Sequence, residues 1–151
     1  MQIEQEFKNE KFILTLDELK AGWAYIIFKS GNICIRVEAS DVLYDTLSDL
    51  VEIAIKSFNG YDCIKSVSQE LSSSADEISI ETKIKPCKNI ELKIGETVIT
   101  CSLQRYARQV LKLFNSYKYE HGINEYYANW AYLFPEKNLE ILKKLLCDNE
   151  K

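Results

Sequence analysis

Apolar and polar residues alternate along much of the first two thirds of the chain, and this period of two predicts β-strands. The alternation is clearest in Trp23–Lys29 and Asn32–Ala39, which Ser30-Gly31 joins with the positive φ of a hairpin turn. Further predicted strands are Phe12–Leu16, Cys63–Leu71, Ile78–Ile84 and Ile90–Ile94. Thr97–Cys101 is either another strand or the bent continuation of the strand before it. This spacing is typical of an antiparallel meander.

Two parts of the chain have the period of 3.6 that predicts helices. The first is Ser40–Phe58, with Ser40 as its N-cap and Asn59-Gly60 as its end. The second is the last third of the chain, where the predicted helices are Ser102–His121, Ile123–Tyr132 and a segment after Phe134-Pro135.

Together these elements predict one α+β domain over residues 1–151, a length that suits a single domain. The expected fold is an antiparallel sheet of five or six strands, with one long helix after the first hairpin. Two or three C-terminal helices are expected to pack on that sheet.

The Ser40–Phe58 helix carries a row of acidic residues on one face. Asp41, Asp45, Asp49 and Glu52 are spaced by four, four and three residues, and at about 100° per residue they fall within an arc of about 80°. The opposite face is apolar, with Leu43, Leu47, Leu50, Val51, Ala54 and Phe58. The helix is therefore expected to bury one edge and to present carboxylates on the other.

The negative charge of the chain is concentrated around this helix. Six acidic residues and one basic residue, Lys56, occur from Glu38 to Asp62, a net charge of −5 against −4 for the whole chain. The rest of the chain is thus close to neutral. A solvated helix exterior explains such a row without any function. The alternative is a surface that binds a basic protein, because complementary fields speed association and fix orientation.

Composition restricts the location of the protein. The longest apolar run, Trp23–Phe28, is far shorter than a membrane span, and the first ten residues lack the pattern of a secretory signal. We therefore expect a cytoplasmic protein that does not insert into membranes. The five cysteines have wide gaps and no CxxC pair, which favours reduced, mostly buried thiols over disulfides or a zinc site.

The sequence does not support an enzyme. It contains no glycine-rich phosphate loop and no GxSxG nucleophile elbow. His121 is the only histidine, so no histidine cluster can bind a metal, and its place at a predicted helix end suits the helix dipole. A solvated carboxylate row lacks the cleft that shifts catalytic pKa values. We expect no catalytic site, no metal and no cofactor.

Two other functions stay open at this point. Tyr126, Tyr127 and Trp130 could line a ligand pocket or active site between the sheet and the C-terminal helices, although aromatic residues at helical spacing are more often core. Arg105, Arg108 and Lys112 form a basic strip that could contact nucleic acid phosphates, but the pI of about 5.2 favours a solvated helix face.

The order of elements carries a resemblance. Its parts are Gly22-Trp23-Ala24-Tyr25-Ile26 with its hairpin, the acidic helix, the strand-rich middle, and Tyr126-Tyr127-Ala128-Asn129-Trp130 with Phe134-Pro135. In these the chain resembles small bacterial immunity proteins, which neutralise toxin domains of contact-dependent or polymorphic toxin systems. The resemblance implies a non-enzymatic inhibitor that binds a toxin domain, often a basic nuclease, through an acidic surface. From charge geometry, the expected contacts are Glu38, Asp41, Asp45, Asp49, Glu52 and Asp62.

Overall fold

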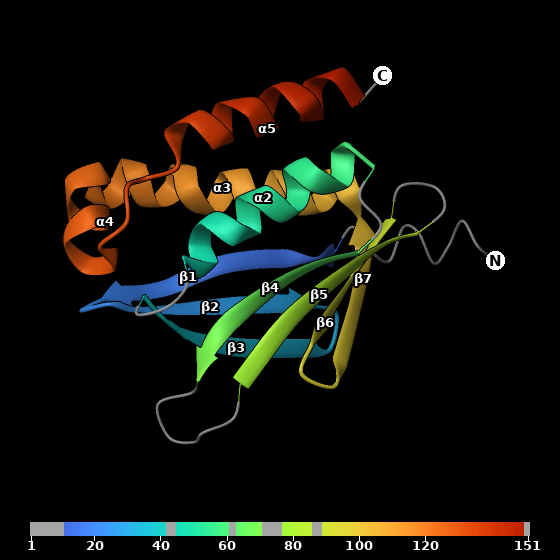
Figure 1. The fold of residues 1–151 in the computed structure, drawn as a ribbon, viewed down its shortest axis with the longest axis horizontal. Helices are drawn as coiled ribbons and strands as arrows, with labels where there is room; N and C mark the ends of the chain where they lie inside the picture. Colours follow the sequence, from blue (N-terminus) through green and yellow to red (C-terminus); the bar gives the residue numbers. More distant parts are fainter. Residues whose placement is uncertain (1–10, 42–44, 61–62, 71–76, 86–88, 150–151) are drawn as a thin grey trace.

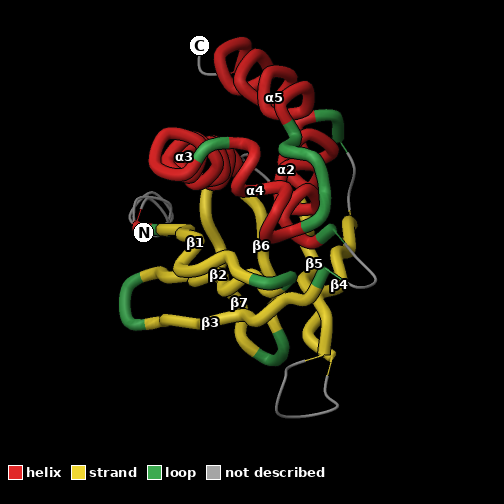
Figure 2. Tube along the Cα trace, turned by 90° about the vertical axis from the view of Figure 1, so that its left-hand side faces the viewer, coloured by secondary structure: helices red, strands yellow, loops and turns green. Residues whose placement is uncertain are grey.

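The computed structural model describes residues 11–41, 45–60, 63–70, 77–85 and 89–149, and for 63–70 and 77–85 it describes the backbone. The chain has an α+β fold in which the helices cover one side of two antiparallel sheets (Figure 1). A quarter turn shows the same two layers, with the helices on one side and the strands on the other (Figure 2). The α+β class expected from the sequence is therefore confirmed.

The strands form two sheets, so the expectation of one sheet with five or six strands is wrong. The first sheet is β1 (Ile13–Lys20), β2 (Trp23–Ser30) and β3 (Ile33–Ser40), in that order. The second sheet is β4 (Cys63–Glu70), β5 (Glu77–Lys85), β6 (Asn89–Ile94) and β7 (Thr97–Ser102), also in chain order. A helix follows β3 and separates the two meanders along the chain, and β3 and β4 then lie close together without belonging to one sheet. Of the two alternatives for Thr97–Cys101, the structure has the separate strand: this segment lies in β7, which pairs with β6.

Strand β1 is longer than its hydrophobic pattern predicts because a bulge interrupts it. Leu14 and Leu16 pair with Phe28 and Ile26, and the register then shifts, so that Glu18 pairs with Tyr25. The extra residue returns Leu19 to the buried face of the sheet, where it is almost fully buried. The alternation thus breaks after Leu16 although the strand continues to Lys20.

The acidic helix begins later than expected. Helix α2 spans Thr46–Phe58, with Asp45 as its N-cap, and the expected cap Ser40 is instead the last residue of β3. Ser40 pairs with Trp23 in the first sheet, which requires an extended backbone. Asp41 therefore precedes the helix and is not part of it. The helix ends at Asn59 as predicted.

The C-terminal third forms three helices, as expected. They are α3 (Leu103–His121), α4 (Ile123–Trp130) and α5 (Glu136–Asn149). Ser102 caps α3 by accepting a hydrogen bond from the Arg105 amide at 3.1 Å, and Gly122 closes the helix with a φ of 86°. Helices α3 and α4 pack on the first sheet, whereas α5 packs mainly on α2 and α3 (Figure 2).

One hydrophobic core lies between the helices and the sheets. Strand β2 contributes Ala24, Ile26 and Phe28 to it, and every C-terminal helix adds buried residues. The largest fully buried side chains are Trp130, Tyr106, Tyr126, Phe12, Phe28 and Phe114. Among the helices in the described ranges, none has the length and the apolar content that crossing a bilayer requires.

Candidate functional site around helix α4

A network of hydrogen bonds joins helix α4 and its C-terminal flank to the β1–β2 turn and to Asp41, which follows β3. The Gly22 amide donates to the Asn129 carbonyl at 2.7 Å, and the Asp41 amide donates to the Gly22 carbonyl at 2.9 Å. The Tyr132 hydroxyl donates to the Asp41 carbonyl at 2.8 Å. Segments distant in sequence therefore meet at one end of the molecule, where α4 lies in Figure 1.

Asp45 is a structural residue within this junction. Its Oδ1 accepts hydrogen bonds from the Ser48 amide at 3.2 Å and from Trp130 Nε1 at 2.8 Å. The first bond caps α2, and the second satisfies the indole of a fully buried tryptophan. The side chain is half-buried, so it does not stand on an exposed ridge as the sequence pattern predicts.

Three carboxylates of the predicted row gather in this place, and we call Asp41, Asp45 and Asp49 the acidic cluster. Each is half-buried. Desolvation raises the pKa of the Tyr132 phenol, and the negative charges of the three carboxylates raise it further. The fold thus brings the three together although Asp41 lies outside the helix, and it places them where the α2 dipole favours negative charge.

The other predicted contact residues lie elsewhere. Glu52 is exposed on α2, one turn beyond the cluster. Glu38 lies on β3 and is 3.6 Å from Arg36, whose guanidinium also approaches Asp17 at 3.6 Å and stands over the Tyr25 ring. Asp62 lies outside the described residues. The structure therefore collects only part of the predicted set in one place.

Helix α4 and its flanks expose large apolar side chains, which we call the α4 patch. Its members are Tyr119, Ile123, Tyr127 and Leu133, with exposed fractions of 91%, 44%, 54% and 79%. Ile123 and Tyr127 are four residues apart and so share one side of α4. Tyr126 and Trp130, on the adjoining side of the helix, are fully buried. The three aromatic residues proposed from the sequence to line a pocket therefore do not share one.

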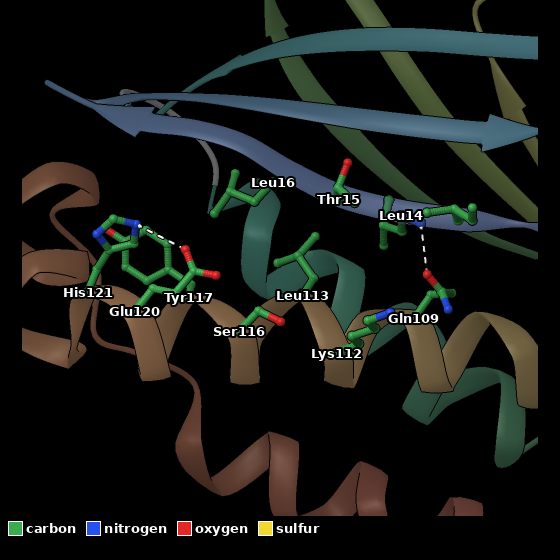
Figure 3. A pocket seen from close by; sticks show the side chains of 11 residues that line it. Leu14, Thr15, Leu16, Gln109, Lys112, Leu113, Ser116, Tyr117, Glu120 and His121 are labelled. Carbon is green, nitrogen blue, oxygen red and sulfur yellow. Dashed lines mark hydrogen bonds and ion pairs between the residues drawn. The ribbon is translucent and has the colours of Figure 1, made fainter.

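A groove runs between the first sheet and the C-terminal helices, and we call it the β1–α3 groove. One cavity, of about 290 Å³, lies between strand β1 and helix α3. A second, of about 200 Å³, shares Leu16, Tyr117 and His121 with the first and reaches α4. Figure 3 shows Tyr117, Glu120 and His121 together at one end of the larger cavity, with Gln109 and Lys112 towards the other.

His121 lies in this groove and is more than a helix-end residue. Its Nδ1 is 2.9 Å from a Glu125 carboxylate oxygen, its Nε2 is 3.9 Å from Glu120, and its ring packs on Tyr117. Desolvation raises the pKa of the Tyr117 phenol, and Asn129 partly offsets this through a side-chain hydrogen bond.

The basic strip predicted on α3 is divided by the fold. Arg105 Nε donates to the Phe12 carbonyl at 2.8 Å and so stabilises the edge of the sheet. Lys112 is exposed and lines the groove, whereas Arg108 is exposed outside it. Arg105 is thus engaged with the sheet, while Arg108 and Lys112 are exposed one turn apart on α3.

The three cysteines whose side chains the structure describes are reduced thiols. Cys101 is buried, but Cys34 and Cys147 are exposed, so the expectation of mostly buried thiols is wrong for these three. Cys63 and Cys87 lie where the structure describes no side chains. In the described ranges, no group of three or more His, Cys, Asp and Glu residues is placed to hold a metal ion.

Comparison with known proteins gives no relative: no family model, no curated protein and no solved structure matches the chain. The resemblance to immunity proteins and the function that it implies therefore stay predictions.

Sequence reasoning missed the groove and its carboxylates. In the sequence, Asp17 and Glu18 only interrupt the pattern of a strand. Glu120 and Glu125, which line the same groove, follow about a hundred residues later in the chain. The one available signal was that the only histidine has acidic residues beside it and four residues after it.

Proposed function

We propose that this protein is a non-enzymatic, cytoplasmic binding protein of the immunity type, which neutralises a cognate toxin domain by covering a positively charged surface. The observation that carries the proposal is the α4 patch, whose exposed apolar residues belong to the same stretch of chain as Glu120 and Glu125. The partner would dock on this end of the molecule.

The apolar part of the surface supports a protein partner. Protein interfaces combine an aromatic and aliphatic centre with a polar rim, and large exposed apolar side chains that gather together mark such sites. Tyr119, Ile123, Tyr127 and Leu133 belong to one short stretch of chain, and two of them are tyrosines, a residue type enriched among binding hot spots.

The charged part of the surface supports a basic partner. Carboxylates from four segments lie around α4 and the groove, namely Asp17, Glu18, Asp41, Asp45, Asp49, Glu120 and Glu125. Positive charge is also present at this end, in Lys20 and in the ion-paired Arg36. The balance nevertheless favours negative potential, which would steer a basic domain into contact and fix its orientation.

The proposal is tested with the polypeptide encoded by the adjacent gene. Tyr127→Ala removes a half-exposed ring from the centre of the α4 patch and is expected to weaken binding at least tenfold, as measured by calorimetric titration. The matched control is Val98→Ala, because Val98 is 44% exposed on β7 and lies outside the patch. Equal affinities of both variants and the wild type would reject the surface.

A charge reversal tests the contribution of α2. The reversal of Asp45, which the sequence pattern suggests, would also remove the cap of α2, so Glu52→Lys is the better variant. We expect a lower association rate and a weaker dependence of that rate on salt, because steering by charge is screened by ions. Glu96→Lys, in the exposed β6–β7 turn, is the control. Unchanged kinetics for Glu52→Lys would remove α2 from the proposed surface.

A further inference from the structure

Strand β1 is an edge strand whose outer side faces helix α3. Among the described strands it pairs with β2 alone. In an antiparallel strand the backbone groups of alternate residues point to the same side. Since the Leu14 amide donates to Gln109 Oε1 of α3 at 3.2 Å, the N–H and C=O groups of Phe12, Leu14 and Leu16 face away from β2.

The first part of this edge is covered by side chains. Arg105 binds the Phe12 carbonyl and Gln109 binds the Leu14 amide, so α3 substitutes for a neighbouring strand at these two positions. Proteins usually protect an exposed sheet edge in some such way, because unpaired N–H and C=O groups are a template for another strand.

The next part of the edge is open. Within the described residues, no hydrogen bond reaches the outward N–H and C=O groups of Leu16. The larger cavity of the groove lies directly beside them, and its opposite wall is formed by Leu113, Ser116 and Tyr117 of α3 (Figure 3). The groove therefore combines a half-apolar wall with backbone groups that need partners.

Charge defines the kind of segment that fits. The second cavity is lined by the carboxylates Asp17, Glu18 and Glu125, and its lining contains no lysine or arginine. Glu120 adds a carboxylate at the end that the two cavities share, while Lys112 lies towards the other end. A bound segment would thus place positive side chains towards α4.

We propose that the β1–α3 groove binds an extended, lysine- or arginine-bearing segment of a protein, which adds to the open edge of β1 as a further strand. The groove follows β1 from Leu14 to Leu19, which at about 3.3 Å per residue accommodates about six extended residues. Backbone hydrogen bonds to Leu16 provide affinity, and the carboxylates select basic side chains. The inference rests on the proposed function insofar as the ligand is a protein segment with positive charge.

The first experiment uses a synthetic six-residue peptide in which lysine and valine alternate. We expect binding detectable by fluorescence anisotropy and chemical-shift changes in the amides of residues 14–19 and of α3. The same peptide with N-methyl groups on alternate amides keeps its charge but cannot form the strand ladder, and its affinity should fall at least tenfold. A peptide with glutamate in place of lysine should not bind.

Two variants test the contacts separately. Leu16→Pro removes the outward amide and leaves the ladder to β2, because the Leu16 amide points away from β2, and it should weaken peptide binding about tenfold or more. Glu18→Lys leaves the backbone intact and should weaken the lysine peptide while improving the glutamate peptide. Glu140→Lys, on the exposed side of α5, is the control for total charge. Glu18→Lys decides the test should Leu16→Pro fail to fold.

The outcomes separate this inference from the proposed function. Peptide binding that is indifferent to N-methylation, or shifts that fall away from β1, would overturn the inference. A wild-type dimer that Leu16→Pro makes monomeric would also overturn it, since the occupant would then be a second copy of the chain. If the adjacent-gene product binds the wild type and Leu16→Pro equally but loses affinity for Tyr127→Ala, the inference is wrong and the proposed function stands. If the peptide binds in the groove but the adjacent-gene product does not bind the protein, the inference stands and the proposed function is wrong.

Discussion

Two buried tyrosines differ in a single hydrogen bond. The Tyr106 hydroxyl donates to the Leu50 carbonyl at 2.9 Å, whereas the Tyr126 hydroxyl is buried and has no hydrogen-bond partner among the described residues. Tyr106→Phe should lower the free energy of unfolding by about 1 kcal/mol, the usual net value of such a bond. Tyr126→Phe should be neutral or stabilising, because it removes a desolvated hydroxyl and keeps the ring. Urea unfolding of both variants checks this, and a larger loss for Tyr126→Phe would contradict the packing described.

Burial of the same phenols predicts a loss of stability in alkali. Burial raises the pKa of Tyr106 well above its usual value, with further contributions from Cys101 and Asp49, and it raises the pKa of Tyr126 as well. Above about pH 10 the unfolded chain releases phenolic protons that the folded chain retains. The contribution of these two phenols to the free energy of unfolding should therefore be constant below about pH 10 and fall as the pH rises towards the folded pKa values.

Urea unfolding at a series of pH values measures this slope. Tyr106→Phe removes one of the buried phenols and should make the decline above pH 10 shallower. An unchanged slope in that variant would contradict the assigned burial.

At the scale of the element, the start of α2 depends on one carboxylate. Asp45→Ala removes the N-cap, which costs about 1 kcal/mol, and leaves the buried indole N–H of Trp130 without its acceptor, which costs about 1–3 kcal/mol more. We expect the free energy of unfolding to fall by about 2–4 kcal/mol in total. Asp45→Asn retains an acceptor oxygen and should lose less than half as much. Equal losses for both variants would show that the charge matters more than the two hydrogen bonds.

The β1–β2 turn offers a second test at this scale. Gly22 has a φ of 84°, and a Cβ atom there would lie 2.9 Å from the Asp41 carboxylate, whereas Gly31 has a φ of 58° and open space around it. Gly31→Ala should therefore cost about 1 kcal/mol, for backbone strain alone. Gly22→Ala should cost more, since the carboxylate must also move. Thermal unfolding of the two variants measures the difference, and equal melting temperatures would contradict the close approach.

The ends of an element were predictable where they depend on residues that are adjacent in the sequence. Helix α3 begins at its Ser102 cap and ends before Gly122, because both signals act within one helical turn. The start of α2 was not predictable in this way: Ser40 is a good cap by type, but its pairing with Trp23 in the first sheet overrides that preference. The bulge in β1 likewise follows from pairing with β2 and hides the second half of the strand from a period-of-two pattern.

At the scale of the whole molecule, the candidate site could be predicted only in part. The concentration of acidic residues before and within α2 is visible in the sequence because these residues are consecutive in the chain. The groove is not visible in the sequence, since Asp17 of β1 and Glu125 of α4 line one cavity only when α4 packs against β1. The row of carboxylates also gave no sign that Asp45 would be used internally, because its partner Trp130 is 85 residues away.

Continuity of the core predicts how the whole chain unfolds. The buried residues from Phe12 to Leu146 form one cluster, to which both sheets and the helices α2, α3, α4 and α5 contribute. Unfolding of any one of these layers would therefore expose apolar side chains of the others to water. A continuous core of this kind should unfold in one transition. In a Trp23→Phe variant, Trp130 is the only indole and reports on the α4–α2 junction, whereas circular dichroism reports on the whole backbone. We expect the two signals to give the same urea midpoint, and an earlier change in the fluorescence would show that the junction opens as an independent unit.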